Sequence, residues 1–162
     1  MTVDRFTVER LYFEDVPVGT TFSTPGRTIG DGDVSRFAGL TGDYNSLHVD
    51  EEYARSTPFG GRIAHGVLVQ GIANGLTTRL PLLIGLQESL LGLLSVECRW
   101  PAPTRIGDTV HVEYQVLEKS LSPSGTKGVL VEQRTALNQH GETVMVSVSR
   151  LLVAGRGEAA GR

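Results

Sequence analysis

Apolar and polar positions follow two different periods along this chain of 162 residues. Up to about residue 85 the apolar residues recur at helical spacing, and beyond it they alternate with polar ones as in strands. The longest helical pattern is VLVQGIANGLTTRL, residues 67–80, whose apolar positions share one face: Val69, Ile72, Ala73, Leu76 and Leu80. Pro81 closes this pattern. We therefore expect a long helix here with one buried face.

Two glycines interrupt this predicted helix. Gly71 and Gly75 lie four positions apart on a face next to the apolar stripe. A glycine inside a helix costs roughly 0.5–1 kcal/mol relative to alanine. Close approach of the helix to a sheet or a neighbouring backbone would compensate for this cost, and simple tolerance of glycine is the alternative.

Two shorter helices are expected before the long one. In DVSRFAGLTGD, Asp33 is a candidate N-cap and Gly42 ends the apolar pattern. In DEEYARS, Asp50 is the candidate cap, and Pro58 stops the helix because the residue before a proline is pushed out of the helical region. The glycine-rich stretch FGGRIAHG then connects to the long helix.

The second half of the chain predicts a run of antiparallel strands. LLSVECRW, DTVHVEYQVLE and both halves of GVLVEQRTALNQHGETVMVSVSRLLV alternate, with a turn at residues 138–141, and TTFSTPGRTI near the start is a weaker strand. This order predicts a single α+β domain over residues 1–162, in which a curved antiparallel β-sheet packs on the long central helix. Residues from about 155 onward have no apolar pattern and are expected to fray.

Composition narrows the class of protein. The formal net charge of −3 gives no basic footprint for a nucleic acid. No stretch reaches the ~18 apolar residues of a membrane span, and the charged start MTVDRFTVERLYFED lacks the apolar core of a secretory signal. The single cysteine, Cys98, excludes an internal disulfide and is typical of a reducing compartment. We therefore expect a cytoplasmic protein that binds neither nucleic acid nor membrane.

The polar stretch TGDYNSLHVD contains the residues best suited to handling protons. Asp43, Asn45 and His48 lie between the first two predicted helices, and His65-Gly66 immediately precedes the long one. A helix N-terminus offers unpaired backbone N–H groups, and glycine at position 66 lets a ligand oxygen approach them closely. A carboxylate, an imidazole and an oxyanion donor are the groups needed to add or remove water next to a carbonyl.

Each of these residues also has an ordinary structural interpretation. Asp43 and Asn45 alone are more often turn or capping residues, and a single histidine such as His48 is more often a hydrogen-bonded structural group. Asp43, His48, His65 and Asp50 are the right residue types for a metal, but they lack the tight spacing of a metal motif, so no metal is expected. The catalytic interpretation depends on the combination of the polar stretch, His65-Gly66 and the long helix.

GDYNSLHVDEEYA together with FGGRIAHG resembles the signature of the MaoC-like, (R)-specific enoyl-CoA hydratases, G-D-x-N-P-L-H followed by A-H-G. The later segment WPAPTRIGDTVHV is similar to the family's G-D-T-V region, and the resemblance extends over about residues 11–152. It implies the hot-dog fold, in which an antiparallel sheet wraps a long helix. Ser46 stands where the family usually has proline, which we expect to change the rigidity of the loop rather than its chemistry.

Position by position, the resemblance implies that Asp43 and His48 are the catalytic pair, that Asn45 positions them, and that the N–H of Gly66 is the oxyanion donor. Three further residues are expected to contact the substrate: His65, Val67 and Asn74. The implied reaction is syn addition of water to a trans-2-enoyl thioester, which gives a (3R)-hydroxyacyl thioester, or the reverse dehydration.

The resemblance also implies the partners. The substrate is an acyl-CoA or acyl-ACP thioester and no cofactor is needed; cations for the carrier phosphates would come from Arg27, Arg55, Arg62, Arg99 or Arg105. Because exposed sheet edges are usually paired or covered, a homodimer or higher homo-oligomer is expected. A hot-dog acyl-CoA thioesterase and a non-catalytic protein that binds acyl thioesters are the two alternatives.

Overall fold

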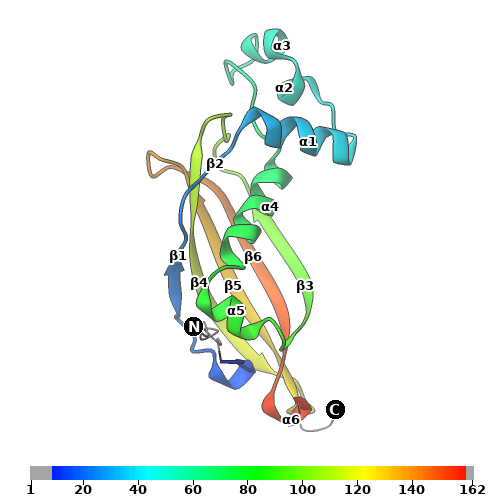
Figure 1. Cartoon of the computed structure of the whole chain (residues 1–162), viewed down its shortest axis with the longest axis vertical. Coiled ribbons are helices and arrows are strands. Elements are labelled where there is room, and N and C mark those ends of the chain that lie inside the picture. The colour runs from blue at the N-terminus through cyan, green and yellow to red at the C-terminus, as the bar shows by residue number, and fades with distance from the viewer. Residues whose placement is uncertain (1–8, 160–162) are drawn as a thin grey trace, which may run out of the picture.

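A curved antiparallel sheet wraps one helix in the structure of the chain, a computed structural model that describes residues 9–159 (Figure 1). The six-stranded sheet has the order β1-β4-β5-β6-β3, and β2 pairs with β4 beside β1. The strands are β1 (Thr21–Ser23), β2 (Arg27–Thr28), β3 (Leu90–Arg99), β4 (Thr109–Leu121), β5 (Lys127–Leu137) and β6 (Thr143–Ala154). Every pair of neighbouring strands is antiparallel, as the alternating second half of the sequence predicts.

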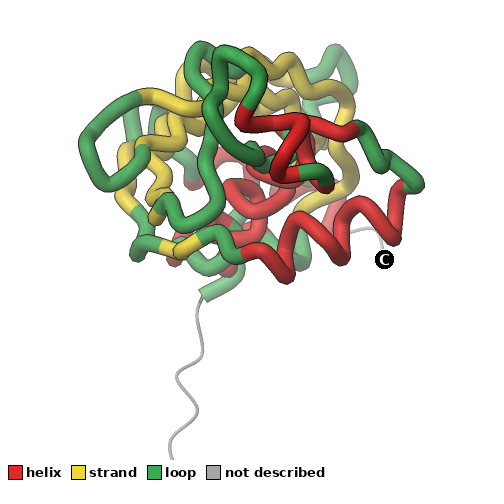
Figure 2. Tube along the Cα trace, turned by 90° about the horizontal axis from the view of Figure 1, so that it is seen from above, coloured by secondary structure: helices red, strands yellow, loops and turns green. Residues whose placement is uncertain are grey.

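The helices that matter for the site are α1 to α4. The central helix α4 lies along its inner face, and α1 to α3 gather beyond one end of the sheet (Figures 1 and 2). The helical elements are η1 (Phe13–Asp15), α1 (Asp31–Thr41), α2 (Ser46–Val49), α3 (Glu51–Arg55), α4 (Gly66–Thr77), α5 (Pro81–Leu86) and α6 (Arg156–Ala159). This is the hot-dog architecture expected from the sequence, with an α+β fold in one domain.

The predicted apolar stripe of the long helix is the face that packs on the sheet. All of its positions are buried: Val69, Ile72, Ala73, Leu76 and Leu80. The buried face of α4 packs in one apolar cluster with Val110 and Val112 of β4, and a second cluster at the other end of the sheet contains Val116, Leu130 and Leu151. At Gly71 and Gly75 an added Cβ would meet nothing within 4 Å, so α4 makes no close approach there to another backbone within residues 9–159.

Several predicted boundaries differ from the structure. The helix α4 ends at Thr77, before the predicted residue 80, and Pro81 begins α5, because proline suits the first position of a helix. Asp33 is the third residue of α1 and not its N-cap. Gly30 takes the cap position, and the Asp33 carboxylate accepts the Gly30 N–H at 3.0 Å. By contrast, Asp50 caps α3 as predicted, accepting the Tyr53 N–H at 3.0 Å.

The weak strand predicted in TTFSTPGRTI is two short strands, β1 and β2, because Pro25 cannot donate to a sheet ladder. The tail predicted to fray from about residue 155 instead forms α6, which is attached to the start of the fold. Arg156 Nη2 lies 2.6 Å from Asp15 Oδ1, and the Gly155 N–H donates to the Thr126 oxygen at 2.7 Å.

Residues 160–162 of that tail lie outside the described part of the chain. So do residues 1–8, the charged start in which no secretory signal is expected. Between residues 9 and 159 no helix is long and apolar enough to cross a membrane.

Candidate active site

Asp43 follows a helix that ends at a sharp turn. The C-cap of α1 is Gly42, which has φ +77° and donates its N–H to the Ala38 oxygen at 2.8 Å. Glycine adopts this left-handed conformation without the steric cost of a Cβ. The turn leaves Asp43 exposed, and its Oδ1 accepts the N–H of Asn45 at 3.3 Å.

His48 lies on a short helix, where the sequence predicts a loop. The four-residue helix α2 is capped by Asn45, whose Oδ1 accepts the Leu47 N–H at 3.0 Å. Ser46, which replaces the usual proline, is its first residue. The Ile63 N–H donates to the Leu47 oxygen at 3.2 Å and so fastens α2 to the segment that leads into α4. Asn45 therefore sets the direction of His48 by capping its helix.

The hydrogen bond of His48 determines which of its ring nitrogens can act as a base. His48 Nδ1 lies 2.8 Å from the backbone oxygen of Ile63. A carbonyl oxygen only accepts, so Nδ1 carries the proton. In the neutral ring Nε2 is then an unprotonated acceptor. This is the tautomer that a general base needs.

His65 is buried between the polar stretch and the start of α4. Its side chain is 3% exposed, and its Nε2 donates to the backbone oxygen of Asp43 at 3.0 Å. The ring centroid lies 3.8 Å from that of His48 and 4.9 Å from that of Phe37. The other ring nitrogen, Nδ1, is buried without a hydrogen-bond partner among the described residues. His65 thus connects the backbone of Asp43 to the ring of His48.

These contacts gather three titratable groups at one point. A carboxylate oxygen of Asp43 and one ring nitrogen from each of His48 and His65 all lie within 4.8 Å of one another. This spacing suits one water held between a carboxylate and an imidazole. Asp50, the fourth residue considered for a metal, caps α3 instead. Since both imidazoles already donate to backbone carbonyls, each offers at most one nitrogen to a cation, and the expectation of no metal stays a prediction.

Gly66 begins α4, as the sequence predicts, with His65 as the N-cap. The first N–H groups of a helix have no partner within the helix, so the Gly66 N–H is available to a ligand. Trp100, which follows β3, lies against this glycine: its Nε1 donates to the Gly66 oxygen at 2.8 Å. A Cβ at position 66 would come within 2.9 Å of the indole ring, so only glycine fits beside Trp100.

Known proteins are similar to this chain over most of its length. The family model described as MaoC like domain matches residues 14–138. An (R)-specific enoyl-CoA hydratase of Rhodospirillum rubrum is 38% identical over 149 residues, which are 90% of this chain and 94% of that protein. A 3-hydroxybutyryl-CoA dehydratase of Methylorubrum extorquens is 42% identical over 109 residues, which are 67% of this chain but only 65% of that protein.

The chain belongs to the MaoC-like dehydratase family. The crystal structure of the MaoC-like dehydratase from Rhodospirillum rubrum superposes with a TM-score of 0.80 at 35% identity, covering 90% of this chain and 98% of that one. The predicted family, the hot-dog fold and the expected enzyme class, a hydro-lyase, are confirmed by these relatives.

In this MaoC-like domain the predicted substrate residues line different cavities. His48 and Gly66 share a cavity of about 320 Å³ with Trp100 and the backbone up to Thr104. Val67 and Asn74 line a groove of about 430 Å³ between α4 and β3. His65 is 3% exposed and lines neither of these two cavities, while it contacts Asp43 and His48. Its predicted contact with the substrate stays a prediction.

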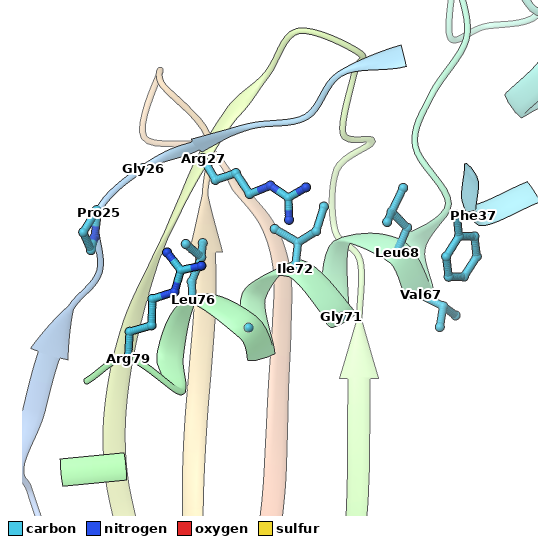
Figure 3. Close-up of a pocket in the computed structure, with 11 residues that line it drawn as sticks. Pro25, Gly26, Arg27, Phe37, Val67, Leu68, Gly71, Ile72, Leu76 and Arg79 are labelled. Carbon is cyan, nitrogen blue, oxygen red and sulfur yellow. The ribbon is translucent and has the colours of Figure 1, made fainter. Parts of the chain in front are cut away.

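A third and larger groove, of about 600 Å³, runs along the other side of α4 (Figure 3). The guanidinium groups of Arg27 and Arg79 lie beside it, with Leu76 and Ile72. Of the five arginines proposed for carrier phosphates, only Arg27 lines this groove, and it is paired with Asp33 at 2.6 Å.

Three of the other four arginines have partners within the chain. Arg55 and Arg62 pair with carboxylates, and Arg105 donates to the Phe59 oxygen. Arg79 has no ion pair among the described residues. Its position at the end of the predicted helix does not by itself indicate a ligand contact. Trp100 stands in the WPAP segment of the resemblance, but only the fold brings it to Gly66.

Proposed function

We propose that this chain catalyses the (R)-specific hydration of 2-enoyl thioesters and the reverse dehydration, with Asp43 and His48 as the acid–base pair. The observation that carries the proposal is the position of His48: its Nδ1–H is fixed on Ile63, which leaves Nε2 as an acceptor in a ring that lies within one water of the Asp43 carboxylate. The same imidazole shares a cavity with Gly66 at the start of α4.

The reaction uses one water held between the two side chains. His48 Nε2 takes one proton of this water as its oxygen attacks C3, while Asp43 accepts a hydrogen bond from the other proton. The electron pair of the double bond moves through C2 to the thioester oxygen, which the Gly66 N–H stabilises as it becomes an enolate. C2 then receives the proton that the water gave up, so the net change is the addition of H and OH to one face.

The thioester lies in the cavity beside His48 and Gly66, and the acyl group continues into the groove lined by Val67 and Asn74. Both cavities meet α4 at its first turn, which supports this division. Arg27 and Arg79 beside the larger groove are suited to a carrier phosphate, because guanidinium groups bind phosphate through paired hydrogen bonds. CoA and an acyl-carrier protein both present such a phosphate.

A second copy of the chain covers the edge of the sheet at β3. This strand ends the sheet order, so its outer backbone groups have no strand beside them within residues 9–159. Its exposed apolar side chains are Leu90, Leu91, Leu93, Leu94 and Val96. An open apolar edge favours pairing with another strand, and a two-fold axis beside β3 would pair two identical edges and bring the open glycine face of each α4 toward the other.

The test is hydration of crotonyl-CoA, followed as loss of enoyl absorbance. The wild type should hydrate it, and Asp43→Asn and His48→Ala should each lose at least ~10²-fold in kcat/KM while keeping the wild-type circular dichroism. His140→Ala is the matched control, because His140 is exposed in the turn between β5 and β6. Near-wild-type activity of either folded site variant would overturn the assignment. Release of free thiol from saturated acyl-CoA would point to a thioesterase instead.

A further inference from the structure

A band of polar side chains separates the two apolar clusters of the core. Strand alternation turns Glu132 and Arg134 of β5 to the inner face of the sheet, together with Leu130 and Ala136, which belong to different clusters. Glu132 is 0% exposed and Arg134 6%. Charged groups in a core are costly unless paired, so a band in this place calls for an explanation.

The band is a connected network across three strands and α4. Arg134 contacts the Glu132 carboxylate, and its Nε donates to Thr77 Oγ1 of α4 at 2.9 Å. Its Nη1 donates to Ser149 Oγ of β6, also at 2.9 Å. Tyr114 of β4 lies beside it, and burial, reinforced by the charge of Glu132, raises the pKa of Tyr114 so that it keeps its proton. The guanidinium has five N–H groups, so these contacts leave further donors for a ligand.

One side of this network opens into the groove assigned above to the acyl group. Arg134, Ser147 and Ser149 line the groove of about 430 Å³, at whose other end stand Phe37 and Val67, next to His65 and Gly66. From Gly66 to Thr77 the helix rises about 16 Å, at 1.5 Å per residue. A four-carbon acyl group with its thioester at Gly66 therefore stops short of the network. A chain of about ten carbons bridges this distance when its thioester oxygen and an oxygen at its distal end each add a hydrogen bond of about 3 Å.

We infer that the Glu132–Arg134 network is the specificity-determining end of the acyl pocket: it admits short alkyl acyl groups and, among longer ones, selects those whose distal end bears a hydroxyl or carbonyl oxygen. The inference rests on the proposed function for its substrate class. A methyl-terminated chain that reaches Arg134 would cover its free N–H donors and the serine hydroxyls without pairing them, which is costly for buried polar groups. A terminal oxygen would pair with them.

The experiment compares crotonyl-CoA, trans-2-decenoyl-CoA and 10-hydroxy-trans-2-decenoyl-CoA. With the wild type, the hydroxylated ten-carbon substrate should exceed its methyl-terminated analogue by at least about tenfold in kcat/KM, as sites built to pair a polar group reject analogues that lack it. The double variant E132L/R134M replaces both charges by apolar groups of similar size, an exchange that buried ion pairs often tolerate. The double variant should abolish this preference. It should also raise kcat/KM for decenoyl-CoA about tenfold relative to kcat/KM for crotonyl-CoA.

Two further variants keep the result interpretable. Gln133→Leu changes the neighbouring residue on the outer face of β5. It should leave the ratios of kcat/KM among the three substrates unchanged. Ser149→Ala removes one hydroxyl but keeps the ion pair; it should lower the hydroxyl preference a few-fold even if the double variant does not fold.

Equal use of the two ten-carbon substrates by the wild type, or an unchanged ratio in the folded double variant, would overturn the inference. If crotonyl-CoA is not hydrated at all, the proposed function fails separately. Calorimetric binding of decanoyl-CoA and 10-hydroxydecanoyl-CoA then tests the pocket by itself, with tighter binding of the hydroxylated ligand expected and equal binding contradicting the inference.

Discussion

Trp100 and Gly66 form a contact that only glycine permits, although the two residues are 34 positions apart. The indole Nε1 donates to the Gly66 oxygen at 2.8 Å, and the nearest atoms of the five-membered ring lie only 2.9 to 3.1 Å from where a Cβ would stand. The contact holds the carbonyl of Gly66 and leaves the N–H of the same residue for a ligand. The position of the proposed oxyanion donor therefore depends on a side chain from the end of β3.

Gly66→Ala should reduce crotonyl-CoA hydration by about tenfold or more, because the new Cβ, 2.9 Å from the ring, must displace either Trp100 or the start of α4. In the double variant Gly66→Ala/Trp100→Ala the clash is removed, so the two losses should be less than additive. Gly32→Ala is the control, since an added Cβ there meets nothing within 4 Å. Steady-state kinetics measures these losses, and thermal unfolding shows whether each variant is folded. If the loss in the double variant equals the sum of the losses in the two single variants, this explanation is contradicted.

His65 should act as a positioning residue through Asp43. Its Nε2–H donates to the backbone oxygen of Asp43. A glutamine amide can place a donor near the same point, whereas asparagine is too short. His65→Asn should therefore lower kcat about tenfold with little change in KM, and His65→Gln should recover part of the loss. If both variants lose activity equally and unfold at the same lower temperature, His65 only supports the core.

The sequence predicts the strongly periodic elements of this fold well. The stripe of α4 and the alternating strands contain enough repeats for the period to be read, and their buried faces agree with it. The helix α2 is only four residues long, too short for any period, so the sequence pattern predicts a loop at His48. Aspartate favours both the cap and the third position of a helix, so the residue type of Asp33 does not distinguish these two positions.

The contacts that organise the site could not be read from local patterns. His65 meets Asp43 across 22 positions and Trp100 meets Gly66 across 34, and both contacts depend on how the sheet folds round α4. The inward direction of Glu132 and Arg134 follows from strand alternation, but their charge argues for the outer face. Only the pairing of the two residues with each other and with Thr77 resolves this conflict.

The link between α6 and η1 should make stability depend on pH. The Tyr12 N–H, followed by the Arg156 guanidinium, lowers the pKa of Asp15 below its ordinary value of 3.8. A carboxyl whose pKa is depressed in the folded state stabilises the fold above its unfolded pKa, and this contribution is lost as pH falls through the folded value. Asp15→Asn should therefore unfold more easily at about pH 7, by roughly 1 kcal/mol or less for so exposed a pair.

The difference between wild type and Asp15→Asn in urea unfolding should shrink as the pH falls below 3.8. Arg156→Gln should show a smaller effect with the same direction, since Asp15 keeps its hydrogen bond from Tyr12 at 2.9 Å. A difference that stays constant down to about pH 2 would mean that the charge of Asp15 does not matter.

The edge of β3 should govern assembly. Leu93 is 60% exposed on this edge strand, and Leu93→Lys should convert the proposed dimer to a monomer, because an edge lysine opposes pairing. Light scattering at micromolar concentration should give the wild type a mass near twice the 17.4 kDa of one chain. Leu121→Lys, on the end of β4 and 55% exposed, is the matched control and should remain dimeric. A monomeric wild type would refute the proposed interface.

The geometry of Asp43, His48 and Gly66 should restrict attack to one face of the alkene. The two side chains hold the water on one side of the substrate, and the start of α4 fixes the thioester oxygen, so attack on the other face would lose the oriented water and the enolate donor together. Each ~1.4 kcal/mol lost is a factor of ten in rate, so near-complete selectivity is expected, with the (3R) alcohol as product. Chiral analysis of the hydrated product of crotonyl-CoA measures this directly. Efficient coupling to an (S)-specific hydroxyacyl-CoA dehydrogenase would contradict the mechanism while leaving the fold and family untouched, because such coupling requires water to arrive from the face opposite His48.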